Sequence, residues 1–552
     1  MKTQKYYLPL ILFLFSLSLW AQDIHYNEVF DDAGNVRQKY KQIYEQYKTL
    51  SFEQKQNIMA LTSLDFQGDN MVHPLPRILD QSEYQILKKG VEQRGKAISL
   101  FLKDHYSGAK NYSRVIPQDV IAQIIDRNGE TAWGNYIKPE NVSFWYGPDI
   151  IRDNQGNFRV IEDNPGFIGG VGDLELASES LTNRMTDYKK SLKPVHPKFY
   201  DQMLNRYKQL AGDGEVVLLQ YADDLIADNE DLRTQKLFEK RGVTTVKIDP
   251  YNPDKKTGPN KLIIEDDGVY VENKMGKKKV GFIIGNVDPL DFDPSHEGNR
   301  YRKLMDEAHF HLDQKEVNGV ERSKLEKLMM PEAKTGKVNL DSLELYLRRN
   351  SPILHYLDAK SPTDGLMTAV LNGKVKMNYS PGLEFMGDKE FYTYVDDMVR
   401  FYLKEEPIIS NITTQSFRKF EGGKGVLNSQ LVDEVFNNMD KYVVKKVDGR
   451  GGDAVWVGPK MDKAELPDVK ARVLSEPHAY IVQEYTPLSE MDDFIVDLRV
   501  ISDVQNNKVI VTDTPWGRAV PKKGNGKVNI SDLGSETAVF VLPDNPCNMV
   551  WH

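Results

Sequence analysis

The segment KYVVKKVDGRGGDAVWVGPK, residues 441–460, has the residue types of a loop that holds phosphates. Gly449, Gly451 and Gly452 lie between two runs of strand-forming residues, so the backbone can turn tightly and direct N–H groups toward an anion. Lys445, on the first of these strands, could neutralise phosphate charge. Because no helix and no Gly-Lys-Ser/Thr sequence follow, the segment is not a P-loop. A hairpin without any ligand is the alternative interpretation.

A second segment, RVIEDN at residues 159–164, offers ligands for a hard metal ion. Alternation along a strand places Glu162 and Asn164 on one face and Asp163 on the other. A carboxylate and a carboxamide side by side supply the oxygens that Mg²⁺ takes when phosphates complete its shell. Asp149 precedes this segment and could add a third ligand from the neighbouring strand. An acidic strand end at the surface is the alternative interpretation.

A third segment, YIVQEY at residues 480–485, is an apolar strand that ends in Gln483 and Glu484. Such a strand end can present main-chain groups to an adenine edge and a carboxylate to ribose hydroxyls. Arg499 and Arg518 lie on later strands, from which their guanidinium groups could reach a phosphate. Structural salt bridges are the alternative role for both arginines.

The elements that must position these groups follow from the periodicity of the sequence. Helical spacing dominates the chain before about residue 140, with a capping box at Ser51 and Gln54. From there, two short strands are joined by the Asn/Gly turn RDNQGN, and residues 215–250 have the order strand, helix, Gly turn and strand of a βαβ unit. A meander of short strands, a helical stretch and a last β-rich part follow. We therefore expect an α/β to α+β protein whose β-rich parts, 141–290 and 440–542, form one site together.

Taken together, these segments resemble the circularly permuted ATP-grasp proteins related to glutathionylspermidine synthases. The likeness covers nearly the whole chain after residue 21 and includes the sequences YNEVFDDAGNVRQKY, PLPRIL, YGPDIIRDNQGNFRVIEDN, VLNGKVKMN, VDDMVRFYLKEEPII, YVVKKVDGRGGDAVWVGP, YIVQEYTPLS, DLRV and GRAV. In an ordinary ATP-grasp enzyme the metal-binding strand follows the nucleotide lysine, whereas here Glu162 and Asn164 precede Lys445. A circular permutation accounts for this order and would bring the two parts into one site.

The resemblance implies a circularly permuted ATP-grasp fold with a helical N-terminal region and a Rossmann-like βαβ segment. We expect the chain to divide into a signal peptide (1–21), a helical N-terminal region (22–140), a first ATP-grasp part with the metal-binding strands (141–200), a βαβ domain (201–300), a mostly helical linking region (301–439) and a second, nucleotide-binding ATP-grasp part (440–552).

The activity that the resemblance implies is that of an ATP-dependent carboxylate–amine ligase. A carboxylate attacks the γ-phosphate of MgATP to give an acylphosphate and ADP, and an amine then displaces phosphate to form an amide. The implied cofactors are ATP and Mg²⁺, and the implied substrates are small-molecule or peptide carboxylates and amines. The implied residue roles are Mg²⁺ binding by Asp149, Glu162 and Asn164, phosphate binding by Lys445, Gly449, Gly451 and Gly452, an adenine hinge of Gln483, Glu484 and Tyr485, and stabilisation of the transferring phosphoryl group by Arg499 and Arg518.

Three segments depart from the family pattern, all on the side expected to bind the acceptor. After the metal motif, NPGFIGGVGDL replaces an arginine and a Pro-Ser-Gly turn. After the meander, Gly285 and Asn286 stand where the family tends to have paired arginines, and a Ser/Gly-rich loop near the end is reduced to SDLGSE. These changes leave the substrates open, and they leave open a protein that has kept the fold but lost catalysis.

Composition and charge limit the partners. The chain has 552 residues, of which 40% are hydrophobic and 28% charged, as in a globular protein with several domains. The formal charge of −9 argues against nucleic acid as a partner, and we interpret the basic clusters MGKKKV and VPKKGNGK as solvated hairpin ends. The single cysteine, Cys547, excludes an intramolecular disulfide and a Cys-rich zinc site.

The N-terminus predicts export. Lys2 and Lys5 precede an apolar run from Leu8 to Trp20, and Ala21 is a plausible cleavage point. The run is shorter than a spanning helix requires, and no later apolar segment is long enough to cross a bilayer. We expect cleavage after Ala21 and a periplasmic or extracellular protein, with a retained N-terminal anchor as the alternative.

Two functions from different classes fit these observations. The intact lysine, glycine-loop and metal-ligand positions favour an exported ligase. The changed acceptor segments and the scarcity of ATP outside the cytoplasm favour a non-catalytic exported binding protein with the same fold. A secreted hydrolase is disfavoured, because the sequence contains no Gly-x-Ser-x-Gly and no His-Glu-x-x-His motif.

Overall fold

The computed structural model of the protein describes residues 25–544 with the exception of 129–136, 167, 223–228, 250–254, 288–299, 301–303, 306, 309–310, 313–320, 331–337, 351–362, 381, 422–423, 450–453, 529 and 531–533. The expected signal peptide and Cys547 therefore lie outside the described residues. Within the described part of the chain, no helix is both long and apolar enough to cross a membrane.

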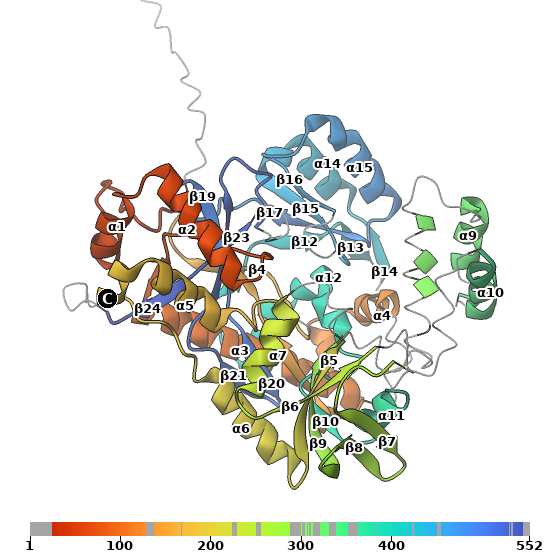
Figure 1. The fold of residues 1–552 in the computed structure, drawn as a ribbon. Helices are drawn as coiled ribbons and strands as arrows, with labels where there is room; N and C mark the ends of the chain where they lie inside the picture. Colours follow the sequence, from red (N-terminus) through yellow and green to blue (C-terminus); the bar gives the residue numbers. More distant parts are fainter. Residues whose placement is uncertain are drawn as a thin grey trace, which may run out of the picture.

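The sheet that carries most of the charged candidate residues combines strands from distant parts of the chain (Figure 1). Its strand order is β11-β4-β3-β19-β22-β23, and β18 pairs with β19. The hairpin predicted around RDNQGN is formed by β3 and β4, and β19 pairs antiparallel with β3. The strands are β3 (Asp149–Arg152), β4 (Phe158–Glu162), β11 (Ser410–Asn411), β18 (Glu490–Met491), β19 (Phe494–Arg499), β22 (Trp516–Pro521) and β23 (Ser535–Thr537).

A second, antiparallel sheet of order β12-β17-β15-β16 carries the glycine loop, which connects β15 to β16. Two helices cover one face of this sheet, at the top of the molecule in Figure 1, and bury an apolar core that includes Val444, Val432 and Val473. The elements are β12 (Thr414–Ser416), β15 (Tyr442–Lys446), β16 (Val455–Val457), β17 (Tyr480–Glu484), α14 (Ser429–Asn437) and α15 (Leu466–Ser475).

The predicted βαβ unit and meander form a third sheet, of order β6-β5-β9-β8-β7, with β10 beside β9. Strands β5 and β6 are parallel and joined through α7, and β7, β8 and β9 follow as antiparallel neighbours. The basic cluster MGKKKV lies at the exposed β8–β9 hairpin, as interpreted from the sequence. The elements are α6 (Phe199–Ala211), β5 (Glu215–Tyr221), α7 (Glu230–Glu239), β6 (Thr244–Ile248), β7 (Lys261–Glu265), β8 (Gly268–Asn273), β9 (Gly276–Asn286) and β10 (Lys376–Met377).

The N-terminal region is mainly helical, and the capping box at Ser51 and Gln54 is present. The PLPRIL segment supplies a strand, β1 (Arg77–Asp80), which pairs in parallel with β24 (Val539–Leu542) near the other end of the chain. The long helix α3 packs on the sheet β2-β20-β21. The elements are α1 (Lys41–Tyr47), α2 (Phe52–Asp65), α3 (Gln81–Ser107), α4 (Gln118–Arg127), β2 (Ser143–Tyr146), β20 (Ser502–Gln505) and β21 (Lys508–Val511).

The part of the chain between the βαβ unit and the second sheet contains short helices and, near its end, strands. Besides β11 and β12, the hairpin of β13 (Arg418–Glu421) and β14 (Lys424–Leu427) lies in this part, which we expected to be mostly helical. The helices of this part include α9 (Arg322–Met329), α10 (Leu340–Asn350), α11 (Leu366–Leu371), α12 (Lys389–Tyr392) and α13 (Val395–Met398). Earlier in the chain, α5 (Leu174–Arg184) precedes the βαβ unit. The expected domain boundaries remain predictions.

Candidate functional site

Strand register brings the candidate charged residues of the first sheet side by side. Asp149 of β3 lies opposite Glu162 of β4 on one side and opposite Arg499 of β19 on the other. Asp497, two positions before Arg499 on the same strand, lies opposite Arg518 of β22. Since residues opposite one another in a sheet point to the same face, these side chains form one charged row.

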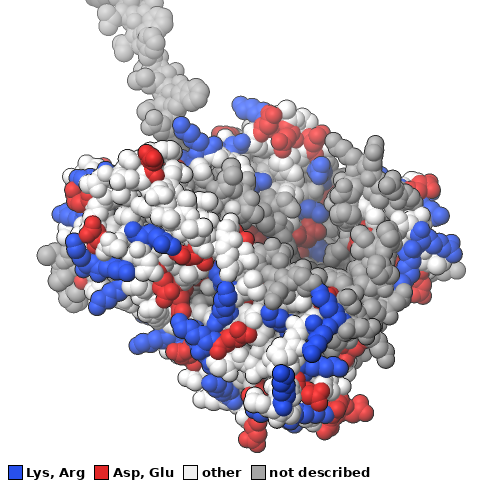
Figure 2. Space-filling view, in the orientation of Figure 1, with Lys and Arg blue, Asp and Glu red and all other residues white. Residues whose placement is uncertain are grey.

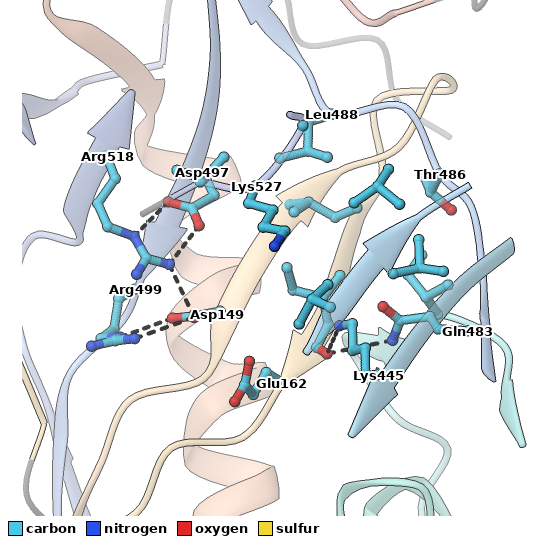
Figure 3. Close-up of a pocket in the computed structure, with 18 of the residues that line it drawn as sticks. Asp149, Glu162, Lys445, Gln483, Thr486, Leu488, Asp497, Arg499, Arg518 and Lys527 are labelled. Carbon is cyan, nitrogen blue, oxygen red and sulfur yellow. Dashed lines mark hydrogen bonds and ion pairs between the residues drawn. The ribbon is translucent and has the colours of Figure 1, made fainter. Parts of the chain in front are cut away.

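This row faces the second sheet across a cavity of about 380 Å³ (Figure 3). In Figure 2, a hollow below the helix-covered sheet exposes acidic and basic side chains together. The predicted site residues that line the cavity are Asp149, Glu162, Asn164, Lys445, Gln483, Glu484, Tyr485, Arg499 and Arg518. Gly449 lies at the start of the glycine loop, and Gly451 and Gly452 lie outside the described residues.

The carboxylate of Asp149 is held by both arginines. Arg499 donates to its two oxygens from Nε (2.8 Å) and Nη2 (3.2 Å), and Nη2 of Arg518 lies 3.0 Å from Oδ2. Burial acts to raise the pKa of Asp149, but the two guanidinium groups outweigh burial and hold this pKa at about 2. Asp149 is therefore a carboxylate at every physiological pH.

The two arginines are thus engaged in carboxylate pairs in this structure. Arg518 also forms a bidentate pair with Asp497, at 2.9 and 2.5 Å. Both guanidinium groups lie near the ring of Trp516: the distance to the ring centroid is 5.5 Å for Arg499 and 5.4 Å for Arg518. The charged row is therefore packed against an aromatic side chain. A phosphoryl group that bound here would share these cations with Asp149 and Asp497.

A lysine that we did not predict lies beside Glu162 at the cavity. Lys389, the first residue of α12, is buried, and its Nζ lies 3.0 Å from a carboxylate oxygen of Glu162. The same amino group donates to the carbonyl of Gly449, so it lies between the end of β4 and the glycine loop. No sequence pattern marks this residue, because α12 is only four residues long and its neighbours at the site come from other elements.

Lys445 lies on the cavity wall with its charge weakened by burial. Its Nζ donates to the carbonyl of Ile161 at 3.3 Å. Burial is the main cause that lowers the pKa of Lys445 to about 8; the carboxylates of Glu162 and Asp149 act to raise this pKa, and the neighbouring Lys389 acts to lower it. A bound polyphosphate would favour the protonated amine, as expected of a phosphate ligand.

The oxygen ligands fit a magnesium ion that phosphates help to coordinate. Asp149, Glu162 and Asn164 share one wall, and the buried amide nitrogen of Asn164 has no hydrogen-bond partner among the described residues. The side-chain amide is therefore not committed to the protein interior. No group of three or more His, Cys, Asp and Glu with metal-binding geometry occurs in the described part of the chain. Substrate and water oxygens must therefore supply much of the shell of any ion bound here.

The other end of the cavity is apolar and suits a flat ring. It is lined by Ile161, Ile412, Val443, Val455, Val457 and Leu488. Gln483 is fixed from behind, because its amide donates to Thr414 Oγ1 (3.0 Å) and Tyr392 OH (3.2 Å). The backbone N–H groups of Glu484 and Tyr485 already bond to the carbonyls of Thr413 and Lys441. A main-chain donor to a base must therefore come from farther along the chain, where Thr486 and Leu488 line the cavity.

The cavity wall also contains charged and aromatic residues that we did not predict, among them Asp497, Trp516 and Lys527. Asp497 could have been found, because it precedes Arg499 by two positions in FIVDLR and alternation places both on one face. Lys527 belongs to the cluster VPKKGNGK, which we interpreted as a solvated hairpin end. That interpretation is wrong for Lys527, whose side chain points into the cavity (Figure 3).

Several proteins are similar to this chain over most of its length. An uncharacterized protein of Mycobacterium leprae is 25% identical over 94% of this chain and 82% of its own length. A protein of Frankia alni, provisionally named glutamate–cysteine ligase 2-3, is 24% identical over 94% of this chain and 54% of its own length, so the chain spans about half of that relative. A solved structure of an apo glutathione synthetase-like effector from Globodera pallida is 10% identical, with a TM-score of 0.47, and covers 89% of this chain and 96% of the effector.

Residues 76–223 and 348–512, more than half of the chain, match the family described as circularly permuted ATP-grasp type 2. The matched segments contain β3 and β4 from the first β-rich part and β15, β17 and β19 from the second, which are among the strands that build the cavity. The match confirms the family and the fold expected from the sequence. The chain belongs to the circularly permuted ATP-grasp type 2 family.

Proposed function

We propose that this protein is an ATP-dependent ligase that joins a carboxylate to an amine through an acylphosphate. The observation that carries this proposal is the convergence, in one cavity, of two buried lysines and three oxygen ligands from parts of the chain far apart in sequence. Membership of the ATP-grasp family supports the class of enzyme. The provisional names of two Frankia relatives, both glutamate–cysteine ligases, describe the formation of an amide from a carboxylate and an amine.

The proposed reaction has two steps. A carboxylate oxygen attacks the γ-phosphorus of ATP, and the bond from that phosphorus to the bridging oxygen breaks, which releases ADP. The nitrogen of an amine then attacks the acyl carbon, phosphate leaves with the electron pair of the C–O bond, and the nitrogen loses a proton. No covalent enzyme intermediate is required, so positioning and charge neutralisation account for catalysis.

The residues of the cavity have the following roles in this proposal. Lys389 and Lys445 neutralise the phosphates, and the apolar end excludes water and packs on the base. Asp149, Glu162 and Asn164 would hold Mg²⁺, which, when bound, shields phosphate charge and orients the γ-phosphate. Arg499 and Arg518 fix the carboxylate of Asp149 and present N–H groups to charge that develops beside it.

A specific observation favours a second candidate function, a binding protein without catalysis. Arg499 and Arg518 form ion pairs with Asp149 and Asp497, which neutralise their charge in this structure. The buried Asn286 lies at the end of β9, where the family tends to have arginine. Asn286 donates to Gln220 and Asp231 at 3.1 Å, so it belongs to a polar cluster rather than to a cationic one. Such a site could bind nucleotide and still lack an acceptor.

The first experiment is calorimetric titration of the purified protein with a non-hydrolysable ATP analogue and Mg²⁺. We expect micromolar binding that K445A and E162A strongly weaken, because each removes a charged group of the cavity wall that the proposal assigns to the phosphates or their metal. K446A is the matched control, since Lys446 is the next residue and its half-exposed side chain pairs with Asp448 outside the cavity. Absence of binding in folded protein, or equal loss in K446A, would overturn the nucleotide site.

A second measurement separates the two functions. The ligase predicts ADP release that depends on a carboxylate and an amine together, measured with pools of amino acids and short peptides. A binding protein predicts tight nucleotide binding and no release of ADP with any pool.

We also propose that the protein is exported, on the strength of Lys2, Lys5, the apolar run and Ala21. Mass spectrometry of the mature N-terminus tests this, and a chain that retains residues 1–21 in the cytoplasm would contradict it.

A further inference from the structure

The segment of residues 521–528, PKKGNGKV, begins at the last residue of β22 and precedes β23 in the chain, and we refer to it as the strap. Its start is fixed to the first sheet. The backbone N–H of Lys522 donates to the carbonyl of Asp493 at 2.9 Å, and the Lys522 side chain lies 2.5 Å from a carboxylate oxygen of Glu490. The strap therefore leaves the sheet that carries the charged row from a defined point.

The far end of the strap lies against the second sheet. Gly526 has a φ of +81°, and a methyl group built on it would lie 3.2 Å from Lys460 and 3.5 Å from Val457 of β16. The side chain of Asn525 accepts a hydrogen bond from the backbone N–H of Lys527 at 2.9 Å, which shapes the last turn. The strap thus bridges the two sheets on either side of the cavity.

The lysines of the strap have different surroundings. Lys522 is paired with Glu490, and Lys523 is exposed and does not line the cavity. Lys527 lines the cavity, and Figure 3 shows its side chain directed inward, toward the space between the charged row and the second sheet. Only the last of the three is positioned to meet a ligand.

We propose that Lys527 is a further ligand of the nucleotide's phosphate chain, presented by the strap across the two sheets. This inference rests on the proposed nucleotide site and goes beyond it, because the family resemblance assigns phosphate binding to Lys445 and to the glycines of the glycine loop and not to Lys527. An ammonium group on a flexible stem suits this task, since it can follow the phosphates without a fixed approach angle.

The charge balance of the cavity supports a cation of this kind. Among the described residues, its lining contains five cationic side chains, of Lys389, Lys445, Lys527, Arg499 and Arg518, and four carboxylates, of Asp149, Glu162, Glu484 and Asp497. Lys389 is paired with Glu162, and the two arginines are paired with Asp149 and Asp497. A polyphosphate brings several negative charges, and each cation of the lining, Lys527 included, can compensate part of them.

The test compares K527M with K523M by calorimetric titration in the presence of Mg²⁺. Methionine keeps the length of the side chain and removes the charge, and Lys523 is an exposed lysine of the same strap. The probes are a non-hydrolysable ATP analogue and adenosine, which lacks phosphates. For K527M we expect about tenfold or greater loss of affinity for the ATP analogue, the size of one charged hydrogen bond, and no change for adenosine. K523M should match the wild type with both probes.

The possible outcomes separate this inference from the proposed function. If K527M binds the ATP analogue as the wild type does while K445A does not, the role of Lys527 is refuted and the nucleotide site stands. If K527M loses affinity for adenosine to the same extent, Lys527 acts on the fold or the base and the assignment to phosphates is wrong. Recovery of affinity in K527R supports the need for a positive charge. If the wild type binds no nucleotide, both proposals fall.

Discussion

At the scale of single residues, the site depends on how burial and neighbouring charges set the ionisation of a few side chains. Asp149 is kept ionised by two arginines in spite of burial, whereas Lys445 has a pKa of about 8 because burial weakens its charge. The first effect keeps the proposed metal ligand Asp149 negatively charged, and the second lets Lys445 gain or lose a proton near pH 8.

This difference predicts proton uptake when nucleotide binds. Near pH 8 about half of Lys445 is deprotonated, and phosphate stabilises the protonated form, so binding should take up a fraction of a proton there. The affinity for the ATP analogue should fall as the pH rises above about 8. Titrations in buffers with different ionisation enthalpies measure the uptake. K445M should abolish it and K446M should not; identical uptake in wild type and K445M would assign the proton to another group.

At the scale of elements, the segment NPGFIGG, residues 164–170 after β4, shows how a backbone position shapes the cavity. Gly170 has a φ of +97°, its N–H donates to Glu230 at 2.5 Å, and a methyl group built on it would lie 2.5 Å from the ring of Trp516. Trp516 contacts both arginines of the charged row. The sequence NPGFIGG, a departure from the family pattern, therefore allows an aromatic side chain to pack directly on the loop.

We predict that G170A destabilises the protein more than G242A does. Gly242 also has a positive φ, +78°, but nothing lies within 4 Å of a methyl group built there. G242A should therefore cost only the backbone strain, about 1 kcal/mol, whereas G170A should cost about 2–3 kcal/mol because Trp516 must also move. Denaturant unfolding measures both free energies. Equal losses in the two variants would mean that the contact with Trp516 contributes nothing.

The elements that could be predicted from the sequence are those whose signals are local. The β3–β4 hairpin, the βαβ unit and the capping box at Ser51 each depend on residues close together in the chain, and all are present. Lys389, by contrast, reaches the site only through packing between α12, the metal strand and the glycine loop, for which no local pattern exists. Lys527 was misinterpreted because a Gly- and Lys-rich turn has the same composition whether it faces solvent or a ligand.

The same limit applies to strand partners. The strands β3 and β19, whose pairing places Asp149 beside Arg499, are separated by more than 300 residues. The family resemblance predicted only that the two β-rich parts form one site, and periodicity could not predict this pairing, because alternation gives the faces of a strand but not its neighbours. The short strands of residues 410–427 were missed for the related reason that two to four residues are too few to show alternation.

At the scale of the whole molecule, the N-terminal end of the described chain is fastened to the sheet that carries the site, and its strand β1 is paired with the C-terminal strand β24 in a separate two-stranded sheet. The N–H of Glu28 donates to the carbonyl of Glu490 of β18, and β1 pairs with β24. Glu28 is fully buried, with Nη2 of Arg77 at 2.5 Å and Nε of Arg152 at 3.3 Å. One carboxylate thus connects the N-terminal segment with β1 and with β3, the strand of Asp149.

We predict that E28Q destabilises the whole molecule by about 3 kcal/mol, because it removes the carboxylate that pairs with the buried Arg77 and leaves the buried Arg152 with Glu83 alone. Burial acts to raise the pKa of Glu28, but Arg152 and Arg77 lower it from 4.5 to about 2. Its contribution to stability is therefore complete above about pH 4.5 and is lost as the pH falls toward 2. Denaturant unfolding between pH 7 and pH 3 should show the gap between wild type and E28Q narrowing in acid.

D187N is the control for this prediction, since Asp187 forms an exposed ion pair with Lys190 at 2.9 Å and its loss should change the unfolding free energy little at any pH. A gap between wild type and E28Q that stays constant down to pH 3 would show that the amide, and not the missing charge, is responsible. An E28Q protein as stable as D187N at pH 7 would refute the view that this buried carboxylate holds the N-terminal segment, β1 and β3 together. Nucleotide affinity measured in the same variants shows whether a disturbance at β3 reaches Asp149, three residues away on that strand.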